Sequence, residues 1–168
     1  DSGNGTWSVA NGVLTQSSTT TSTTTNAIGP TLSVARAAVT TSAHVIALGN
    51  ATNGGENPHV SVAAGVAQNQ SYWCSVVDEG NNDKLYATVV RQGMFPSFPN
   101  TDWPGTFAAN SDLQINLSLL GNNNVCTAVQ GATTANISGT MGSTTGTVQL
   151  ATRTASASFD YLFVVSMP

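Results

Sequence analysis

Aromatic, amide and acidic side chains gather in a proline-rich stretch in the middle of the chain, residues 93–110. Sugar sites in proteins use aromatic faces against the apolar face of the sugar ring, and amide or acid groups for its hydroxyls. The candidate ligand-binding residues in this stretch are Phe95, Phe98, Asn100, Asp102 and Trp103. Three prolines exclude a central strand and predict a long loop, a kind of segment that is often functional. Two interpretations stay open: a ligand platform, or a rigid plug that caps one end of the domain.

A second group of candidates lies on two predicted strands, residues 72–78 and 85–92. Alternation along a strand places Tyr72 on the same face as Cys74 and opposite Trp73. We expect Cys74 on an outer face, as in a disulfide between neighbouring strands, and Tyr72 would then lie outside with it. The candidates for a concave ligand surface are Tyr72, Tyr86, Arg91 and Gln92. Ordinary packing is the alternative for each of them.

Acid and base catalysis finds little support in the sequence. A glycosidase needs two carboxyl groups about 5 to 9.5 Å apart, but the glutamates are Glu56, in a Gly/Asn loop, and Glu79, at a predicted hairpin tip. A lyase needs a Tyr or His base and a cation that neutralises a uronate carboxylate, yet no R-x-E, Q-x-H or Y-x-K motif is present. The sequence contains no G-x-S-x-G motif, which would have indicated a serine nucleophile. Glycosidase and lyase activity therefore stay as alternatives to a non-catalytic role.

The two cysteines, Cys74 and Cys126, are predicted to form a disulfide. An even number of cysteines in a chain of extracellular character permits one bridge. The alternative is two buried thiols that pack as small hydrophobic side chains. Neither cysteine has metal-ligand spacing to a histidine, so we expect no zinc site.

The composition excludes several classes of partner. Of the 168 residues, 4 are Lys or Arg and 8 are Asp or Glu, so charged residues make up 7%, against about 25% in typical globular proteins. So few basic residues cannot follow a phosphate backbone or hold an anionic lipid surface, and we expect no nucleic-acid partner. Apolar runs fall far short of the ~18 residues that span a bilayer, so we expect no membrane insertion. A surface of hydroxyl and amide groups favours a secreted protein.

Short alternating runs separated by Gly, Asn, Ser and Thr indicate an all-β fold. Alternation is clearest in residues 113–119, where four aliphatic side chains share one face. The predicted strands cover residues 7–10, 13–16, 32–39, 44–48, 60–67, 72–78, 85–92, 113–119, 125–130, 148–151 and 159–165. No segment predicts a helix with comparable strength. We therefore expect one domain, residues 1–168, built as a two-sheet antiparallel β-sandwich with jelly-roll connections.

Four motifs in order then resemble a known family. Residues 5–16, GTWSVANGVLTQ, are similar to the "W-x-V-x-x-G-x-L-x-Q" opening of laminin G-like, concanavalin A-like jelly-roll domains. Residues 64–73 resemble the "aGvaxR…nyY" hairpin, 113–131 the "LxLxxxGnxvxaxvxG" pair, and 146–161 the closing "GxvGL…aaFD". The chain departs from the pattern at Gln68, where many members carry Arg, and at Gln149, which replaces a Gly.

The resemblance implies a concanavalin A-like sandwich of the kind found in carbohydrate-binding modules. It also implies a structural Ca²⁺ site, for which Asp160 and Asp1 are the candidate ligands. The expected function is a non-catalytic, extracellular module or lectin-like domain that binds a polysaccharide or glycan and is attached to a larger enzyme or surface protein. The alternatives are a structural, adhesion or coat domain that contacts protein, and a polysaccharide lyase or glycosidase.

Overall fold

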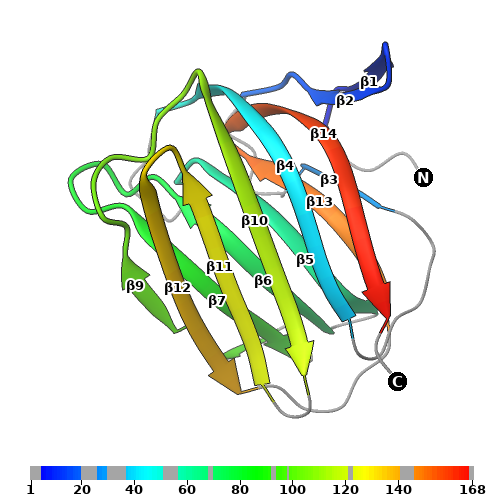
Figure 1. The fold of residues 1–168 in the computed structure, drawn as a ribbon, viewed down its shortest axis with the longest axis vertical. Helices are drawn as coiled ribbons and strands as arrows, with labels where there is room; N and C mark the ends of the chain where they lie inside the picture. The colour runs from blue at the N-terminus through cyan, green and yellow to red at the C-terminus, as the bar shows by residue number, and fades with distance from the viewer. Residues whose placement is uncertain are drawn as a thin grey trace.

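The protein is an all-β sandwich of two packed sheets (Figure 1). The computed structural model describes residues 5–19, 26–29, 37–50, 57–67, 70–91, 94–97, 99–120, 123–140 and 146–166. These ranges hold fourteen strands and no helix, so none that is long and apolar enough to cross a membrane. The expected fold class is confirmed.

The strands are short and follow one another closely along the chain. They are β1 (Trp7–Ala10), β2 (Val13–Gln16), β3 (Asn26–Ile28), β4 (Ala37–Leu48), β5 (His59–Ala67), β6 (Gln70–Val77), β7 (Lys84–Arg91), β8 (Met94–Ser97), β9 (Asn100–Asp102), β10 (Ser111–Leu120), β11 (Asn123–Gln130), β12 (Thr133–Thr140), β13 (Thr147–Arg153) and β14 (Ala155–Ser166). Between β1 and β2, Asn11 and Gly12 both have positive φ, 52° and 81°, as the two-residue turn predicted there requires.

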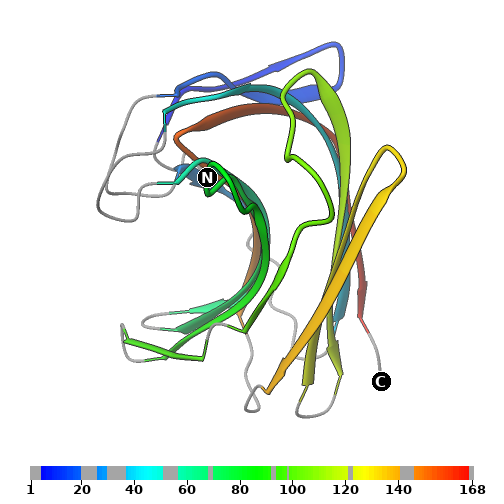
Figure 2. The ribbon, with the colours of Figure 1, turned by 90° about the vertical axis from the view of Figure 1, so that its left-hand side faces the viewer.

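The two sheets differ in their strand order and in their shape. Sheet 1 has the order β1-β2-β14-β4-β10-β11-β12, and sheet 2 has the order β3-β13-β5-β6-β7-β8, with β9 also paired to β7. Figure 2 shows that sheet 2 bends strongly, so that its face directed away from sheet 1 is hollow. We call this hollow surface of sheet 2 the concave face. Ligand sites are usually concave, so this face is the candidate surface for a ligand.

Alternating side chains from the two inner faces form the core. On β10, Leu113, Ile115, Leu117 and Leu119 are fully buried, as their alternation predicts. Leu85, Ala87 and Val89 do the same on β7. Every second residue of these strands therefore points away from the core, and on β7 those residues face the concave side.

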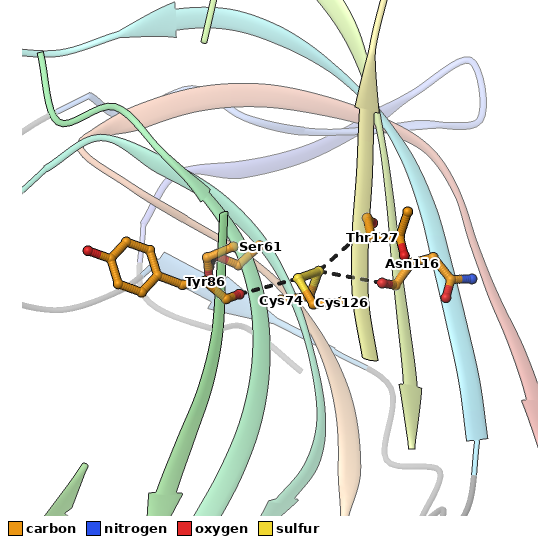
Figure 3. Close-up of a disulfide and its surroundings, with 7 residues drawn as sticks. Ser61, Cys74, Tyr86, Asn116, Cys126 and Thr127 are labelled. Atoms are coloured by element: carbon orange, nitrogen blue, oxygen red, sulfur yellow. Dashed lines mark hydrogen bonds between the residues drawn. A yellow bond between two sulfur atoms is a disulfide. The ribbon is translucent and has the colours of Figure 1, made fainter. Parts of the chain in front are cut away.

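The disulfide crosses the core and links the two sheets (Figure 3). Cys74 on β6 and Cys126 on β11 are bonded at 2.03 Å, and both are fully buried. The predicted pairing is confirmed, but the expectation that Cys74 lies on an outer face is wrong. The strands it joins lie in different sheets, so the bridge runs through the interior. The sulfurs also lie 3.3 Å from the carbonyl oxygen of Tyr86 and 3.4 Å from that of Asn116, contacts without a donated hydrogen because a disulfide has no S–H.

Strands β3, β8 and β9 were not predicted, the last two lying where a loop was expected. Strands β4 and β12 differ from the prediction because their residues are polar. Strand β4 is continuous across the segment where two strands with a break were predicted. Thr41 in its middle is fully buried, and its hydroxyl donates to the carbonyl of Tyr161 at 2.7 Å, which satisfies the polar group. Strand β12, which pairs with β11, was not predicted, because its alternating residues are mostly Thr, Asn and Ser.

The proline-rich segment supplies edge pairing and then closes one side of the sandwich. Its prolines are compatible with β8 and β9 because both strands pair only with β7 at the border of sheet 2. After β9, Trp103 and Phe107 enter the core with exposures of 4% and 2%. The carboxylate of Asp83 accepts the N–H of Phe107 at 2.6 Å, and its carbonyl accepts that of Trp103 at 2.7 Å. The burial of both rings supports the plug interpretation.

Candidate functional site

Strand β6 presents its tryptophan, and not its tyrosine, to the concave face. Tyr72 is 1% exposed and shares the inner face with Cys74. The prediction that Tyr72 belongs to the ligand surface is therefore corrected: it is a core residue. Trp73 alternates away from it, is partly exposed, and lies near the middle of the concave face. It is the functional candidate that the sequence reasoning missed, although the alternation had shown that one of the two rings must point outward.

The indole of Trp73 is held along its own strand. Its Nε1–H donates to the hydroxyl of Ser71, two residues away on the same face, at 2.6 Å. Its cross-strand neighbours are Ala63 on β5 and Thr88 on β7, and Ala63 is fully buried. A small residue beside the ring and a hydrogen bond at its polar edge leave the apolar part of the ring for a flat ligand.

Tyr86 and Glu79 form a fixed polar pair beside the tryptophan. The phenol of Tyr86 donates to Oε1 of Glu79 at 2.5 Å, and its ring points away from the disulfide, out of the core (Figure 3). Burial, the hydrogen bond to Glu79 and the charge of Glu79 together raise the pKa of Tyr86 to about 12. At neutral pH the pair therefore offers a neutral phenol and carboxylate lone pairs, which accept hydrogen bonds from hydroxyl groups.

Small residues make the floor of the concave face between β13 and β7. Ser61 on β5 and Ser75 on β6 are register partners, and their hydroxyls are hydrogen-bonded at 2.7 Å. Ala63 and Ala151 are fully buried on the same face. Because small side chains stand here in place of large ones, Trp73 and Tyr86 are the large aromatic side chains that the described central strands of this face carry.

Strand β9 extends the concave face with two of the predicted ligand residues. Asn100 pairs with Tyr86 and Asp102 with Lys84, and directly opposed residues of an antiparallel pair point to the same side. Asn100 and Asp102 are both exposed. The Lys84 ammonium donates to the Asp102 carboxylate at 2.5 Å and lowers the pKa of that carboxyl. The structure thus brings Tyr86, Asn100 and Asp102 onto one surface from separate parts of the chain.

The other predicted ligand residues do not join this surface in the described part of the protein. Trp103 is buried, so its ring offers no exposed stacking face. Phe98 and Gln92 lie outside the described residues, and so do the side chains of Phe95 on β8 and Arg91 on β7. For these four residues ligand binding stays a prediction.

The calcium expectation also stays a prediction. Asp160 lies on β14 with an exposed side chain that accepts a hydrogen bond from Ser42 at 3.3 Å, and Asp1 lies outside the described residues. Among the residues that the structure describes, no three or more His, Cys, Asp or Glu side chains gather as metal ligands.

The titratable groups near the concave face are poorly suited to general base catalysis. A general base works best with a pKa near the working pH. The pKa of Tyr86 is about 12, and burial followed by the charge of Arg153 lowers the pKa of His59 to about 4. Neither group is poised near neutrality, and Glu79 is already engaged by Tyr86.

A cavity of about 520 Å³ lies elsewhere, between the sheets at the border where β2 and β14 face β3 and β13. Its apolar lining includes Leu14, Ile28, Leu150, Phe159 and Leu162. Asp160 and Tyr161 are the polar side chains of this lining. The concave face combines an aromatic ring with fixed polar groups, so it is the better candidate site for a glycan.

Sequence comparison identifies no relative: no protein-family model matches the chain, and no curated protein does. Solved structures do match in fold. The carbohydrate binding module CBM66 from Bacillus subtilis has a TM-score of 0.67 at 12% identity, and the match covers 97% of this chain and 92% of that one. The CBM2 module of the Lactobacillus casei BL23 phage J-1 evolved Dit has a TM-score of 0.63 at 12% identity, covering 96% and 79%.

The same fold occurs in proteins of other kinds. An alginate lyase from Klebsiella pneumoniae has a TM-score of 0.59 at 9% identity, over 79% of this chain and 60% of that one. At such identities the likeness concerns the fold, which hosts many activities. The chain therefore has the two-sheet jelly-roll β-sandwich fold that its sequence motifs indicated, the fold shared by these carbohydrate-binding modules.

Proposed function

We propose that this protein is a non-catalytic carbohydrate-binding domain and that its concave face holds the glycan. The observation that carries the proposal is Trp73, a partly exposed ring at the centre of a hollow sheet face, fixed by Ser71 and flanked by the Tyr86–Glu79 pair. Structural neighbours that are carbohydrate-binding modules support it. In this mechanism a sugar ring stacks on the indole, and its hydroxyls bond to Glu79, Tyr86, Thr88 and Asn100.

We also propose an extracellular setting and attachment to a larger protein. A buried disulfide persists in oxidising compartments and is rare in the cytosol. Two further structural neighbours are larger proteins of which this chain matches about a third: the Bacteroides ovatus xyloglucan PUL GH43B, at 34%, and a xylan β-1,4-xylosidase from Bacillus halodurans, at 32%. Their TM-scores are 0.64 and 0.60. A module of this fold within a longer chain is therefore a known arrangement.

The test is a polysaccharide gel-shift and glycan-array screen with the wild type and Trp73→Ala. We expect the wild type to be retarded by at least one polysaccharide and the variant to migrate freely. Phe163→Ala is the matched control, because it removes an exposed ring from the outer face of sheet 1 and leaves the concave face intact. Wild-type protein that binds no neutral or acidic glycan contradicts the proposal, and so does undiminished binding by Trp73→Ala.

A second candidate function, contact with protein, rests on a different surface. On β14, Tyr161, Phe163 and Val165 are 45%, 63% and 45% exposed and alternate onto the outer face of sheet 1. Exposed apolar stripes of this kind mark interaction surfaces. A structural or coat domain would form stable oligomers in light scattering, and Phe163→Ser would dissociate them. A monomer at high concentration would exclude self-association through this stripe.

A further inference from the structure

Arg153 lies on the concave face at the opposite side from β9. It ends strand β13 and is the register partner of His59 on β5. Thr152, one residue earlier, is fully buried toward the core, so alternation turns Arg153 to the concave side. The same row of the sheet continues through Val77 on β6 to Lys84 on β7. Three strand spacings separate the backbones of the two cationic residues, about 14 Å along the sheet.

Arg153 has no counter-charge among the residues that the structure describes. The charge pairs in these residues are His44–Asp112 and Lys84–Asp102. Lys84 is therefore neutralised by Asp102, its partner on the adjacent strand β9, whereas Arg153 has no such partner among the described residues. The Nε atom of Arg153 is buried and has no hydrogen-bond partner in the part of the chain that the structure describes. A guanidinium that has lost water at one nitrogen and gained no acceptor is unusual, because buried polar groups are normally bonded.

His59, the neighbour of Arg153, does not compensate for this charge. Burial and the Arg153 charge lower the pKa of His59 to about 4, so the imidazole is neutral at pH 7. It neither supplies an anion to the guanidinium nor adds a second positive charge. The fixed positive charge at this side of the concave face is that of Arg153.

We propose that Arg153 is the anion subsite of the concave face and that the bound glycan is acidic, carrying a carboxylate or sulfate group. This inference rests on the proposed function, since it names the class of glycan held beside Trp73. The planar fork of a guanidinium matches carboxylate and sulfate oxygens in a way that a point charge does not. Glu79 and Asp102 lie toward the β7 and β9 side. Lys84 compensates the charge of Asp102, so the charge of Glu79 is the one that orients the glycan with its anionic group toward β13.

The test is titration calorimetry with three oligosaccharides of matched length: neutral, uronate-containing and sulfated. The proteins are the wild type, Arg153→Gln and Arg153→Lys. Asn136→Asp, on the exposed outer face of β12, changes the net charge by the same one unit and serves as the control. Thermal melting of each variant establishes that it is folded.

We expect the wild type to prefer an acidic ligand to the neutral one. Arg153→Gln should weaken acidic binding at least about tenfold and neutral binding less than about twofold. Arg153→Lys should recover part of the loss, and Asn136→Asp should keep the preference. The uronate and sulfated ligands distinguish which anion is bound. Raising the NaCl concentration from about 0.05 to 0.5 M should weaken the acidic ligand selectively.

Two results overturn the inference and leave the proposed function standing. One is equal binding of neutral and acidic ligands by the wild type. The other is an acidic preference that survives Arg153→Gln. Absence of binding to all three ligands and in the wider glycan screen would instead contradict the proposed function, and the inference with it.

Discussion

The two outward faces of the sandwich both display aromatic side chains, but they differ in curvature and in how the most prominent ring is held. On the outer face of sheet 1, Phe163 is 63% exposed and has no polar atom of its own in the side chain; its register partner Thr40 accepts a hydrogen bond from Asn116 at 2.7 Å. On the concave face, Trp73 is less exposed, yet Ser71 anchors its ring. Exposure of an aromatic side chain is therefore a poorer guide to a sugar site than its surroundings.

Strand curvature adds to this difference. Sheet 2 bends, so that β5, β6 and β7 curve around the concave side (Figure 2). Serines and alanines line the floor there, and they are buried. On sheet 1, by contrast, three exposed side chains, Tyr161, Phe163 and Val165, form a row along β14, and Val9, Ile46 and Leu120 are exposed on other strands of the sheet. A curved face can surround a ligand, whereas a row of side chains can only be covered by a flat partner.

The largest effect on stability is expected from the link between the sheets. The double variant Cys74→Ala/Cys126→Ala should lose about 4 kcal/mol of unfolding free energy, because the bridge closes a loop across 52 residues of sequence separation. Urea unfolding measures this loss, and a reductant should have no effect on the variant. A loss below about 1 kcal/mol would mean that packing alone holds the concave sheet against sheet 1.

The second prediction compares the two faces directly. Trp73→Ala should weaken glycan binding by about 2 kcal/mol, or about 30-fold, the size typical of a central Trp in a binding site. Phe163→Ala, on the other face, should change binding less than twofold. Isothermal titration of both variants with the same oligosaccharide gives the two numbers. Equal losses would remove the distinction between the faces.

The third prediction concerns the plug, which belongs to neither face. Asp83→Ala should lower stability by about 1 to 2 kcal/mol, because it leaves the N–H groups of Phe107 and Glu79 without their acceptor. Burial raises the pKa of Asp83 in the folded protein. Since the folded state then binds its proton more tightly than the unfolded chain, stability falls as pH rises from the unfolded pKa through the raised folded pKa.

Denaturant unfolding of wild type and Asp83→Asn over this acid range isolates the Asp83 contribution. The amide variant should lack this part of the pH dependence. Glycan affinity should be unchanged wherever the variant is folded. A change in affinity would show that the plug also shapes the concave face.

The smallest effect is expected at the polar pair. Tyr86→Phe should weaken binding by roughly 1 kcal/mol, the usual value of one hydrogen bond.

The pKa of Tyr86 is raised to about 12 by burial and by Glu79. Because the folded state holds the phenol proton more tightly than the unfolded chain, Tyr86 contributes to the free energy of unfolding. That contribution is complete below the unfolded pKa of about 10 and is lost as pH rises through 12. Glu79→Gln should lower the pKa of Tyr86, because it removes the carboxylate that raises it. NMR titration of the tyrosine ring carbons measures this pKa, and the Tyr161→Phe variant identifies the Tyr161 signals.

Much of the fold could be predicted because its physical cause is local. Alternating aliphatic residues on β10 and β7 identified strands and their buried faces. Prolines excluded a central strand between β7 and β10, and the structure has only edge strands there. The continuity of β4 and the whole of β12 were not predicted, because hydroxyl side chains give no hydrophobic period. Thr41 of β4 is nevertheless buried and hydrogen-bonded in the fold.

The candidate site could be predicted only in part. Tyr86, Asn100 and Asp102 were named as candidates, and their shared face follows from the register between β7 and β9. Tyr72 was placed on the wrong side, because two adjacent aromatic residues alternate equally well in either direction. Trp103 satisfied the chemistry of a sugar platform, but its ring lies in the core. Side-chain type indicates what a residue can do, and only its surroundings decide whether it is available.

The sequence by itself determined an all-β chain with few charges, one disulfide and a jelly-roll order of motifs. The all-β class and the low charge follow from composition and from period-two alternation, which act along the chain. The order of motifs rests on the resemblance to laminin G-like domains, and the disulfide on the even number of cysteines. Tertiary structure alone decided which face of β6 is concave, because the bridge from Cys74 reaches across the core to β11 and turns Trp73 outward. It also left Arg153 beside a neutral His59 without an acidic partner in the described residues. Contacts between strands distant in sequence set both outcomes, and no local pattern encodes them.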